Sequence, residues 1–319
     1  MVDERYIFMA KNPKIAIIIL TKDALEMTKE QLLNVAKLDT HGLDVTCLIV
    51  DNGSMDGTKE ELKTYKLPNM NYKFIYNNSN LGFAGGNNVG IKYALQNKFD
   101  YIILMNNDLI LPSDLVTKLV LFMSKNKKVG LASPKMYFAN GYEFHKDRYS
   151  KEELGKVIWY AGGIIDWDNI YSSHRGVDEV DRGQYDQVDN TEVANGACLI
   201  IRSEVFDKIG LLDGSLFLYW EDADFSLRAK RFGYEVKYFP DTCLWHKVSM
   251  SAGGSGGFTN DYFLTRNRLY FAMRYAKVRT KIAVLKDTMK LAIYGREWQK
   301  IGARDALLGK KGIGSWARK

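Results

Sequence analysis

The sequence predicts an α/β fold with a mostly parallel central sheet flanked by helices. Short apolar runs alternate with helical patterns up to about Met136, which is typical of βαβ units. Polar residues follow several of these runs, where the loops of a parallel sheet gather. The length of 319 residues and the apolar content of 46% suffice for one large domain with an appendage.

The first half of the chain supplies four predicted strands and four predicted helices. The predicted strands are short apolar runs, namely Lys14–Leu20, Val45–Asp51, Tyr72–Tyr76 and Tyr101–Met105. The predicted helices lie between or after them, over Ala24–Lys37, Gly57–Tyr65, Gly85–Gln96 and Pro112–Ser124. Proline at a helix start is favourable, as at Pro112.

The second half of the chain is less regular. Residues Ala139–Asn190 are polar and rich in aromatic side chains, which predicts an insertion or a small antiparallel piece. Regular patterns then return, with a strand-like run, three helices and a further strand. These elements are Glu192–Ile201, the helices Glu204–Ile209, Glu221–Phe232 and Asn260–Ala276, and the strand Glu235–Phe239.

Charge and hydropathy limit the class of protein. The net charge is +7, but residues 277–319 carry twelve Lys or Arg against three acids, a net +9, so the remainder is slightly acidic. The longest apolar run, Ile15–Leu20, has the length of a strand rather than a membrane span. The first residues lack a signal-peptide pattern, and Cys47, Cys198 and Cys243 predict buried, reduced thiols. We therefore expect a cytoplasmic protein.

Two polar loops predict a nucleotide site. Asp51 and Asn52 directly follow a strand and suit the hydroxyls and ring edges of a nucleoside, whereas Asp56 is better explained as a cap of the next helix. The segment Asn80–Gly90 is rich in glycine and opens a helix, so its backbone can approach a ligand closely. Its spacing matches neither a dinucleotide-binding fingerprint nor a P-loop.

A third strand, Ile102–Met105, ends in Asn106, Asn107 and Asp108. Magnesium and manganese ions prefer oxygen ligands and often take only one or two from the protein. Asp108 is therefore the predicted metal ligand. A later His246 also follows a strand.

Three acids crowd the predicted start of the helix Glu221–Phe232. Such acids interact favourably with the helix dipole, by roughly 0.3–1 kcal/mol each. Asp224 and Arg228 have the spacing of an ordinary i, i+4 ion pair. Asp222 lies on the side of the apolar stripe and is the better predicted general base. Further along, Arg266 or Arg268 is a predicted phosphate ligand, and Trp159, Trp167 and Trp220 could stack on sugar rings.

Taken in order, these motifs resemble inverting glycosyltransferase family 2 with the GT-A fold, in particular its rhamnosyltransferase-like branch. The resemblance runs from about Lys14 to Arg274. It implies a nucleotide-sugar-binding half over residues 1–136, an acceptor-binding half over 137–276, and a basic helical tail over 277–319. The family's Asp-x-Asp motif is Asn106-Asn107-Asp108 here, which leaves Asp108 as the main metal ligand.

The resemblance also implies a role for each site residue. Catalysis falls to Asp222 as general base, acceptor binding to Trp220, Glu221 and Asp224, and binding of Mn²⁺ or Mg²⁺ to Asp108 and His246. Donor binding falls to Thr21, Asp51, Asn52, Asn80, Gly82, Phe83, Asn87, Asn107 and Arg268. The expected donor is a dTDP-sugar, with rhamnose as the first choice, or a UDP-sugar. The expected acceptor is a hydroxyl of a glycan or of a lipid-linked glycan.

Two other functions remain open at the level of sequence. A sugar nucleotidyltransferase would carry a basic, glycine-rich loop after the first strand, but this chain has Leu20-Thr21-Lys22-Asp23-Ala24. A binding module without catalysis would use the basic tail, although acidic clusters argue against nucleic acid as its ligand. The tail, with Leu285, Leu291, Ile293 and Trp298 among its cations, predicts peripheral contact with the inner face of the cell membrane. A solvated helix or a homodimer contact is the alternative.

Overall fold

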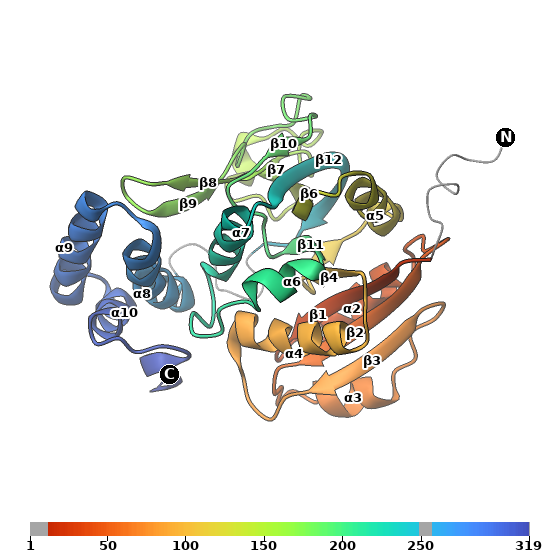
Figure 1. Ribbon diagram of the computed structural model, residues 1–319, viewed down its shortest axis with the longest axis horizontal. Helices are drawn as coiled ribbons and strands as arrows, with labels where there is room; N and C mark the ends of the chain where they lie inside the picture. Colours follow the sequence, from red (N-terminus) through yellow and green to blue (C-terminus); the bar gives the residue numbers. More distant parts are fainter. Residues whose placement is uncertain (1–11, 249–256, 319) are drawn as a thin grey trace.

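The computed structural model describes residues 12–248 and 257–318, and it confirms the four strands expected in the first half. They run parallel in the order β3-β2-β1-β4 within a larger sheet (Figure 1). Their bounds are β1 Lys14–Thr21, β2 Asp44–Asp51, β3 Asn71–Tyr76 and β4 Tyr101–Met105. The accompanying helices are α2 Leu25–Val35, α3 Thr58–Thr64, α4 Gly82–Gln96 and α5 Leu115–Lys125.

The other half of the sheet contains a long central strand that the sequence did not predict. Strand β6, Val129–Phe138, lies between β11, Cys198–Arg202, and β12, Glu235–His246. Its internal Pro134 hides the strand pattern, because proline cannot donate to a ladder hydrogen bond. Strand β12 was expected to end at Phe239, but it continues beyond an irregularity in its pairing with β6. This extension carries His246 to the edge of the sheet.

Strand β11 reverses the direction of the sheet. It is antiparallel to both β4 and β6, and Met105 at the end of β4 pairs with Cys198 at the start of β11. Residues just before β11 therefore lie at the carboxyl end of β4. Smaller elements complete this half: β5 Leu109–Ile110, β7 Ile158–Tyr160, β8 Gly163–Asp166, β9 Tyr171–His174, β10 Asp189–Asn190, α6 Glu204–Ile209 and α7 Glu221–Arg231.

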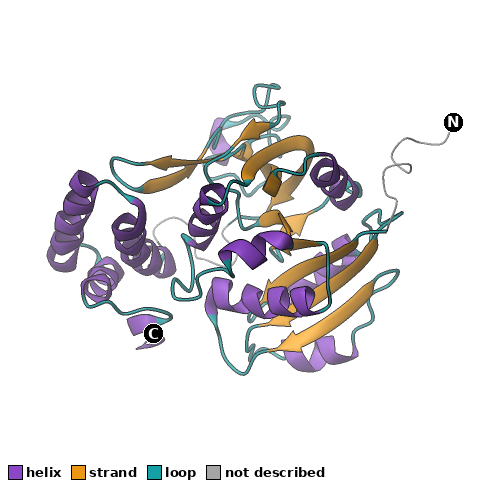
Figure 2. Cartoon of the chain, viewed as in Figure 1, coloured by secondary structure: helices purple, strands orange, loops and turns teal. Residues whose placement is uncertain are grey.

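Helices cover both faces of the sheet (Figure 2). Strand β1 shows why: Ile15, Ile17 and Ile19 pack into a core with α2 and α5, whereas Ala16 and Ile18 pack into a second core with α4, α6 and α7. Successive side chains of a strand point to opposite faces, so a strand buried on both sides reads as a continuous apolar run. The expected antiparallel piece is confirmed as the β8–β9 hairpin.

The tail is helical, as expected, and it packs on the helix that precedes it. The elements are α8 Phe258–Tyr275, α9 Val278–Tyr294, α10 Glu297–Leu307 and a final 3-10 turn, Gly314–Arg318. Figure 1 shows these helices grouped beside the sheet, with α9 outermost. Ion pairs join Arg268 to Asp287 and Asp261 to Arg296. The proposed boundary at residue 276 stays a prediction.

One predicted membrane residue of the tail faces the protein. The ring centroid of Trp298 lies 4.8 Å from that of Trp316 and 6.1 Å from that of Tyr262. Trp298 therefore packs in a small aromatic cluster between α8 and the end of the chain. Leu285 and Ile293 are exposed, as expected, whereas Leu291 is half-buried. Among the described residues, no helix is long and apolar enough to cross a bilayer.

Candidate active site

Thr21 and Asp51 end two neighbouring strands, and the sheet register places them opposite one another. The ladder continues beyond them, since the backbone N–H of Asn52 donates to the carbonyl of Thr21 at 2.8 Å. Both side chains are buried. A carboxylate oxygen of Asp51 accepts the backbone N–H of Ser54 at 3.0 Å, which holds the loop after β2 close to the sheet edge.

A residue that the sequence did not indicate joins Thr21 to the end of β4. The hydroxyl groups of Thr21 and Thr28 lie 2.7 Å apart, and the Asn107 amide donates to Thr28 at 3.2 Å. Thr28 also donates to the carbonyl of Ala24 at 2.8 Å. The first turn of α2 thereby fixes two predicted donor contacts. Helix periodicity alone shows Thr28 as a polar residue with no distinguishing signal.

The side chain of Asn52 is a structural hub, which revises its predicted contact with the donor. Its carboxamide donates to Asn80 Oδ1 at 2.9 Å and to the carbonyl of Gly82 at 3.1 Å. It accepts the Asn77 amide at 3.1 Å and the backbone N–H of Leu81 at 3.0 Å. Two donors and two acceptors are the full capacity of this group. Asn52 therefore positions the loop that carries Asn80 and Gly82.

The start of α4 is packed against a distant loop. Gly82 has a φ of +75°, and a side chain there would collide with the carbonyl and ring of Phe217. The backbone N–H of Ala84 donates to that carbonyl at 3.3 Å, and the Asn87 amide donates to the carbonyl of Phe83 at 2.9 Å. The glycine thus permits a close approach between the predicted donor loop and the acceptor half.

Asp108 and His246 come together, as the metal prediction requires. Strand β5 pairs with the end of β12, so His246 Nε2 lies 3.1 Å from Asp108 Oδ1. Both side chains are buried, and neither Asp108 Oδ1 nor His246 Nδ1 has a hydrogen-bond partner among the described residues. Within the described part of the chain, no group of three or more His, Cys, Asp or Glu could hold a metal.

This pair fits a divalent ion that also binds a diphosphate. Asp108 Oδ1 lies within ion-pair distance of His246 Nε2 but accepts no hydrogen bond among the described residues, so a bound cation would satisfy it. Ions that serve nucleotide chemistry usually take few ligands from the protein and the rest from phosphate and water. Carboxylate oxygens and water suit both magnesium and manganese.

Aromatic and polar side chains from β7 and β9 surround His246. The Trp159 ring lies edge-on between His246 and His174, with centroid distances of 4.3 and 4.5 Å. Burial lowers the pKa of His174 to about 4, so this imidazole is neutral. Its Nδ1 lies 2.9 Å from the Trp159 carbonyl and its Nε2 lies 3.0 Å from the Asn195 amide, so Nδ1 carries the proton. The sequence indicated only the aromatic character of this region.

Asp222 lies at the start of α7 and faces the turn before β11. Its Oδ2 accepts the backbone N–H of Gly196 at 3.3 Å, and its Oδ1 accepts that of Ala223 at 2.8 Å. The Phe83 ring packs against the same Gly196, so predicted donor and catalytic residues converge there. Burial raises the pKa of the Asp222 carboxyl. A carboxylate with a raised pKa is a stronger base.

The neighbouring Glu221 is buried without a partner for its Oε2 among the described residues. Burial, reinforced by the charge of Asp222, raises the pKa of Glu221 to about 8. The two carboxyl groups titrate together. Because a charge on one carboxyl opposes ionisation of the other, the pair favours one negative charge over two.

Asp224 has structural partners, and its predicted acceptor contact stays a prediction. Its carboxylate, only 1% exposed, is bound by Arg228 at 2.8 Å, by Arg274 and by the Tyr275 hydroxyl. These partners come from α7 and α8. The expected i, i+4 pair is confirmed, but both carboxylate oxygens are already satisfied.

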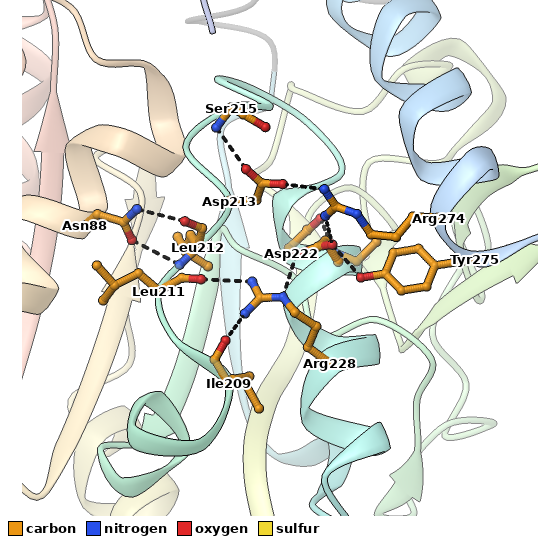
Figure 3. Close-up of polar contacts among 12 residues, drawn as sticks. Asn88, Ile209, Leu211, Leu212, Asp213, Ser215, Asp222, Arg228, Arg274 and Tyr275 are labelled. Carbon is orange, nitrogen blue, oxygen red and sulfur yellow. Dashed lines mark hydrogen bonds and ion pairs between the residues drawn. The ribbon is translucent and has the colours of Figure 1, made fainter. Parts of the chain in front are cut away.

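The same arginines hold the segment that leads to α7. Arg228 donates to the carbonyls of Ile209 and Leu211, and Arg274 pairs with Asp213 at 2.9 Å (Figure 3). On the opposite side, Asn88 of α4 exchanges two hydrogen bonds with the backbone of Leu212, at 2.9 and 3.1 Å. This segment is thus fixed between α4 on one side and α7 and α8 on the other.

The loop directly before α7 is strained. Phe217, Tyr219 and Trp220 have φ values of +67°, +67° and +74°, a region that residues other than glycine rarely adopt. Such residues persist where surrounding contacts hold them, and they cluster at functional sites. Trp220 is buried, with its ring 4.4 Å from that of Phe271. Its predicted role in stacking on an acceptor sugar is therefore not supported, because the core covers the ring.

Arg266 and Arg268 face structural partners rather than the predicted phosphate. Arg268 donates to the carbonyl of Asn169 at 2.8 and 3.0 Å, pairs with Asp287, and lies over the Tyr171 ring. Arg266 is fully buried and donates to backbone carbonyls of the strained loop and the tail. Arg266 and Arg268 lie on a helix, as predicted, but the sequence does not indicate which elements pack against this helix.

The chain matches a known protein family over more than half of its length. A family model described as Glycosyl transferase family 2 matches residues 16–210. The chain belongs to this family. The expected GT-A-type fold is also confirmed by similar structures. One is the mannosyltransferase PcManGT from Pyrobaculum calidifontis in complex with GDP-Man and Mn²⁺, with a TM-score of 0.55, 14% identity, and coverage of 98% of this chain and 77% of that one.

Two named relatives are similar to more than half of this chain. The low-salt glycan biosynthesis hexosyltransferase Agl10 of Haloferax volcanii is 24% identical over 58% of this chain and 53% of its own length. The dTDP-rhamnosyl transferase RfbF of Shigella flexneri is 23% identical over 68% of this chain and 66% of its own length. Across the curated relatives, the match spans from 26% to 66% of their length.

The structural role of Asp224 predicts a large loss of stability in Asp224→Asn. Removing one charge from a buried ion-paired network costs about 3 kcal/mol or more, because the remaining arginines lose their counterion. The matched control is Asp114→Asn, since Asp114 also forms an i, i+4 pair but both partners are 44% exposed. That variant should lose less than about 1 kcal/mol. Chemical denaturation measures both, and equal losses would contradict the assignment.

The raised pKa of Glu221 predicts that the stability of the protein depends on pH. Its pKa in the folded state, about 8, exceeds the ordinary value of 4.5, so the folded state binds a proton that the unfolded state has released. The free energy of unfolding should therefore fall as the pH rises between these two values. Glu221→Gln should reduce this fall and be more stable than wild type at alkaline pH. Urea titrations across this range test it, with exposed Glu152→Gln as control. An unchanged slope in Glu221→Gln would refute the raised pKa.

Proposed function

We propose that this chain transfers a hexosyl group from a nucleoside-diphosphate sugar to an acceptor hydroxyl, with inversion at the anomeric carbon. The observation that carries the proposal is the placement of Asp222. This carboxylate is a base with a raised pKa and faces Gly196, at the same edge of the sheet as Asp108 and His246. Family membership supports the class of reaction.

The reaction needs one base and one leaving group. Asp222 takes the proton of the acceptor hydroxyl while its oxygen forms a bond to the anomeric carbon. The bond from that carbon to the diphosphate oxygen breaks, and its electron pair leaves with the diphosphate. Displacement in one step inverts the configuration. When Glu221 is protonated, it adds no second negative charge beside Asp222 and can donate a hydrogen bond to the acceptor.

Asp108 and His246 are the proposed holders of a divalent ion, either manganese or magnesium. When bound, such an ion neutralises the charge that develops on the departing diphosphate. Asp51, Thr21 and Asn107 line the same sheet edge and are the proposed contacts of the nucleoside. The loop over Asn80, Gly82, Phe83 and Asn87 is proposed to close over the donor.

The donor and the acceptor are proposed by analogy. The relative named as a dTDP-rhamnosyl transferase supports a dTDP-sugar, and a glycan biosynthesis hexosyltransferase among the relatives supports a glycan acceptor. PcManGT was solved with GDP-Man and Mn²⁺, so guanosine donors belong in the test. Uridine donors remain the second choice.

The first experiment is calorimetric titration with dTDP, UDP and GDP, each with and without Mn²⁺. We expect one diphosphate to bind in a metal-dependent manner. Asp108→Asn should weaken that binding about tenfold or more, because it removes the charged ligand of the ion. Asp207→Asn, an exposed carboxylate on α6, is the control and should bind as wild type does. If no diphosphate binds, a carbohydrate-binding module becomes the better function.

The second experiment tests the base. Asp222→Asn should bind the preferred diphosphate and Mn²⁺ normally but lose turnover by roughly 10² to 10⁴-fold, the usual contribution of general base catalysis. Turnover is measured by release of nucleoside diphosphate in the presence of an acceptor. Near-normal turnover in this variant would remove Asp222 from the role.

A further inference from the structure

Helix α9 is amphipathic, but its more apolar face is exposed, which is the reverse of a surface helix in a water-soluble protein. The side chains that it buries are mostly small or polar. They are Thr280, Val284, Thr288 and Ala292. Five large apolar side chains are between 37% and 72% exposed. They are Val278, Ile282, Leu285, Met289 and Ile293.

These five exposed side chains, which we call the α9 stripe, form one continuous row. Their spacings of four and three residues match the period of an α-helix, so they line a single face. Figure 1 places α9 at the outer edge of the molecule, away from the sheet. Packing against the described chain therefore does not account for this face. Large contiguous apolar surface usually marks a binding site.

Charge selects the partner. Arg279, Lys286 and Lys290 are exposed and lie along one flank of the α9 stripe, as the helical period of 100° per residue requires. The acid of this helix, Asp287, is half-buried and pairs with Arg268 of α8. The exposed side of α9 thus combines apolar and positively charged residues without a carboxylate.

We propose that α9 docks on an anionic lipid bilayer, in the plane of the interface and with the α9 stripe inserted. Amphipathic helices with basic residues beside an apolar face bind membranes in this manner. A second copy of the chain fits less well, since it would bring like charges together without an acid to pair with them. Nucleic acid would satisfy the cations but leave the apolar row exposed to water.

The docked helix is rigidly connected to the candidate active site. The Arg268–Asp287 ion pair joins α9 to α8, and Asn267 on α8 binds the carbonyls of Leu216, Leu218 and Tyr219 in the strained loop before Asp222. A lipid-linked acceptor in the bilayer would therefore be close to the transferase site. Lipid docking itself does not require the proposed chemistry.

Vesicle co-sedimentation of the full chain tests the inference. Vesicles of phosphatidylcholine alone are compared with vesicles that also contain phosphatidylglycerol, at low and high salt. We expect binding to the anionic vesicles that weakens with salt. The double variant Ile282→Gln, Met289→Gln should bind at least about tenfold more weakly, because inserted apolar area is lost. The variant Lys286→Gln, Lys290→Gln should show a similar loss and a smaller dependence on salt.

Matched controls place the effect on α9. Leu33→Gln removes an exposed apolar side chain of α2, and Lys127→Gln, Lys128→Gln removes two exposed cations far along the chain from α9. Both should bind as wild type does. Circular dichroism and the melting temperature confirm that each variant is folded, and binding of nucleoside diphosphate is measured separately.

Three outcomes overturn the proposal. The first is a wild-type chain that does not sediment with anionic vesicles, and the second is binding of both α9 variants as strong as that of wild type. The third is a wild-type dimer that becomes monomeric in the Ile282→Gln, Met289→Gln variant and ignores vesicles, which would assign the α9 stripe to a second copy. Loss of vesicle binding with normal nucleotide binding in the α9 variants supports the proposal, whatever the transferase assays give.

Discussion

The side-chain amide of Asn267 holds the strained loop before α7, and the candidate site depends on this contact. Its nitrogen lies 2.8 to 3.0 Å from three backbone carbonyls of that loop. Arg266 donates to the amide oxygen of Asn267 at 2.9 Å, which turns the nitrogen toward the loop. Each strained residue there costs on the order of 1–3 kcal/mol, so the loop needs such support. From this loop, Phe217 contacts the start of α4 and α7 presents Asp222.

Burial separates the acids at the start of α7 into two kinds. Asp224 is buried with two arginines and a tyrosine, so its charge is fully compensated and stabilises the packing of α8 on α7. Glu221 and Asp222 are close to each other without a cation among their described partners, so their pKa values rise. Uncompensated burial of this kind is characteristic of groups that exchange protons during catalysis.

The structure places the sequence candidates Asp51, Asp108 and Asp222 at one edge of the sheet. Asp51, Asp108 and Asp222 stood out because each follows an apolar run or opens a helix, and such positions are defined by local pattern. Asn52 was found by the same pattern, but its role as a hub depends on Asn77 and Asn80, which only the folded loops bring within reach. Thr28, Gly196 and His174 were missed because nothing in their immediate neighbours marks them.

The sequence by itself determined the parallel half of the sheet, the helical tail and the polar ends of the strands. These features follow from the periods of a strand and a helix, which a chain expresses over a few residues. Only the tertiary structure decided the features that depend on long-range contacts. These are the insertion of β6, the meeting of Asp108 with His246, and the structural roles of Asp224 and Arg268. A side chain's partners come from elements far apart in the chain, so its burial and charge balance arise only on folding.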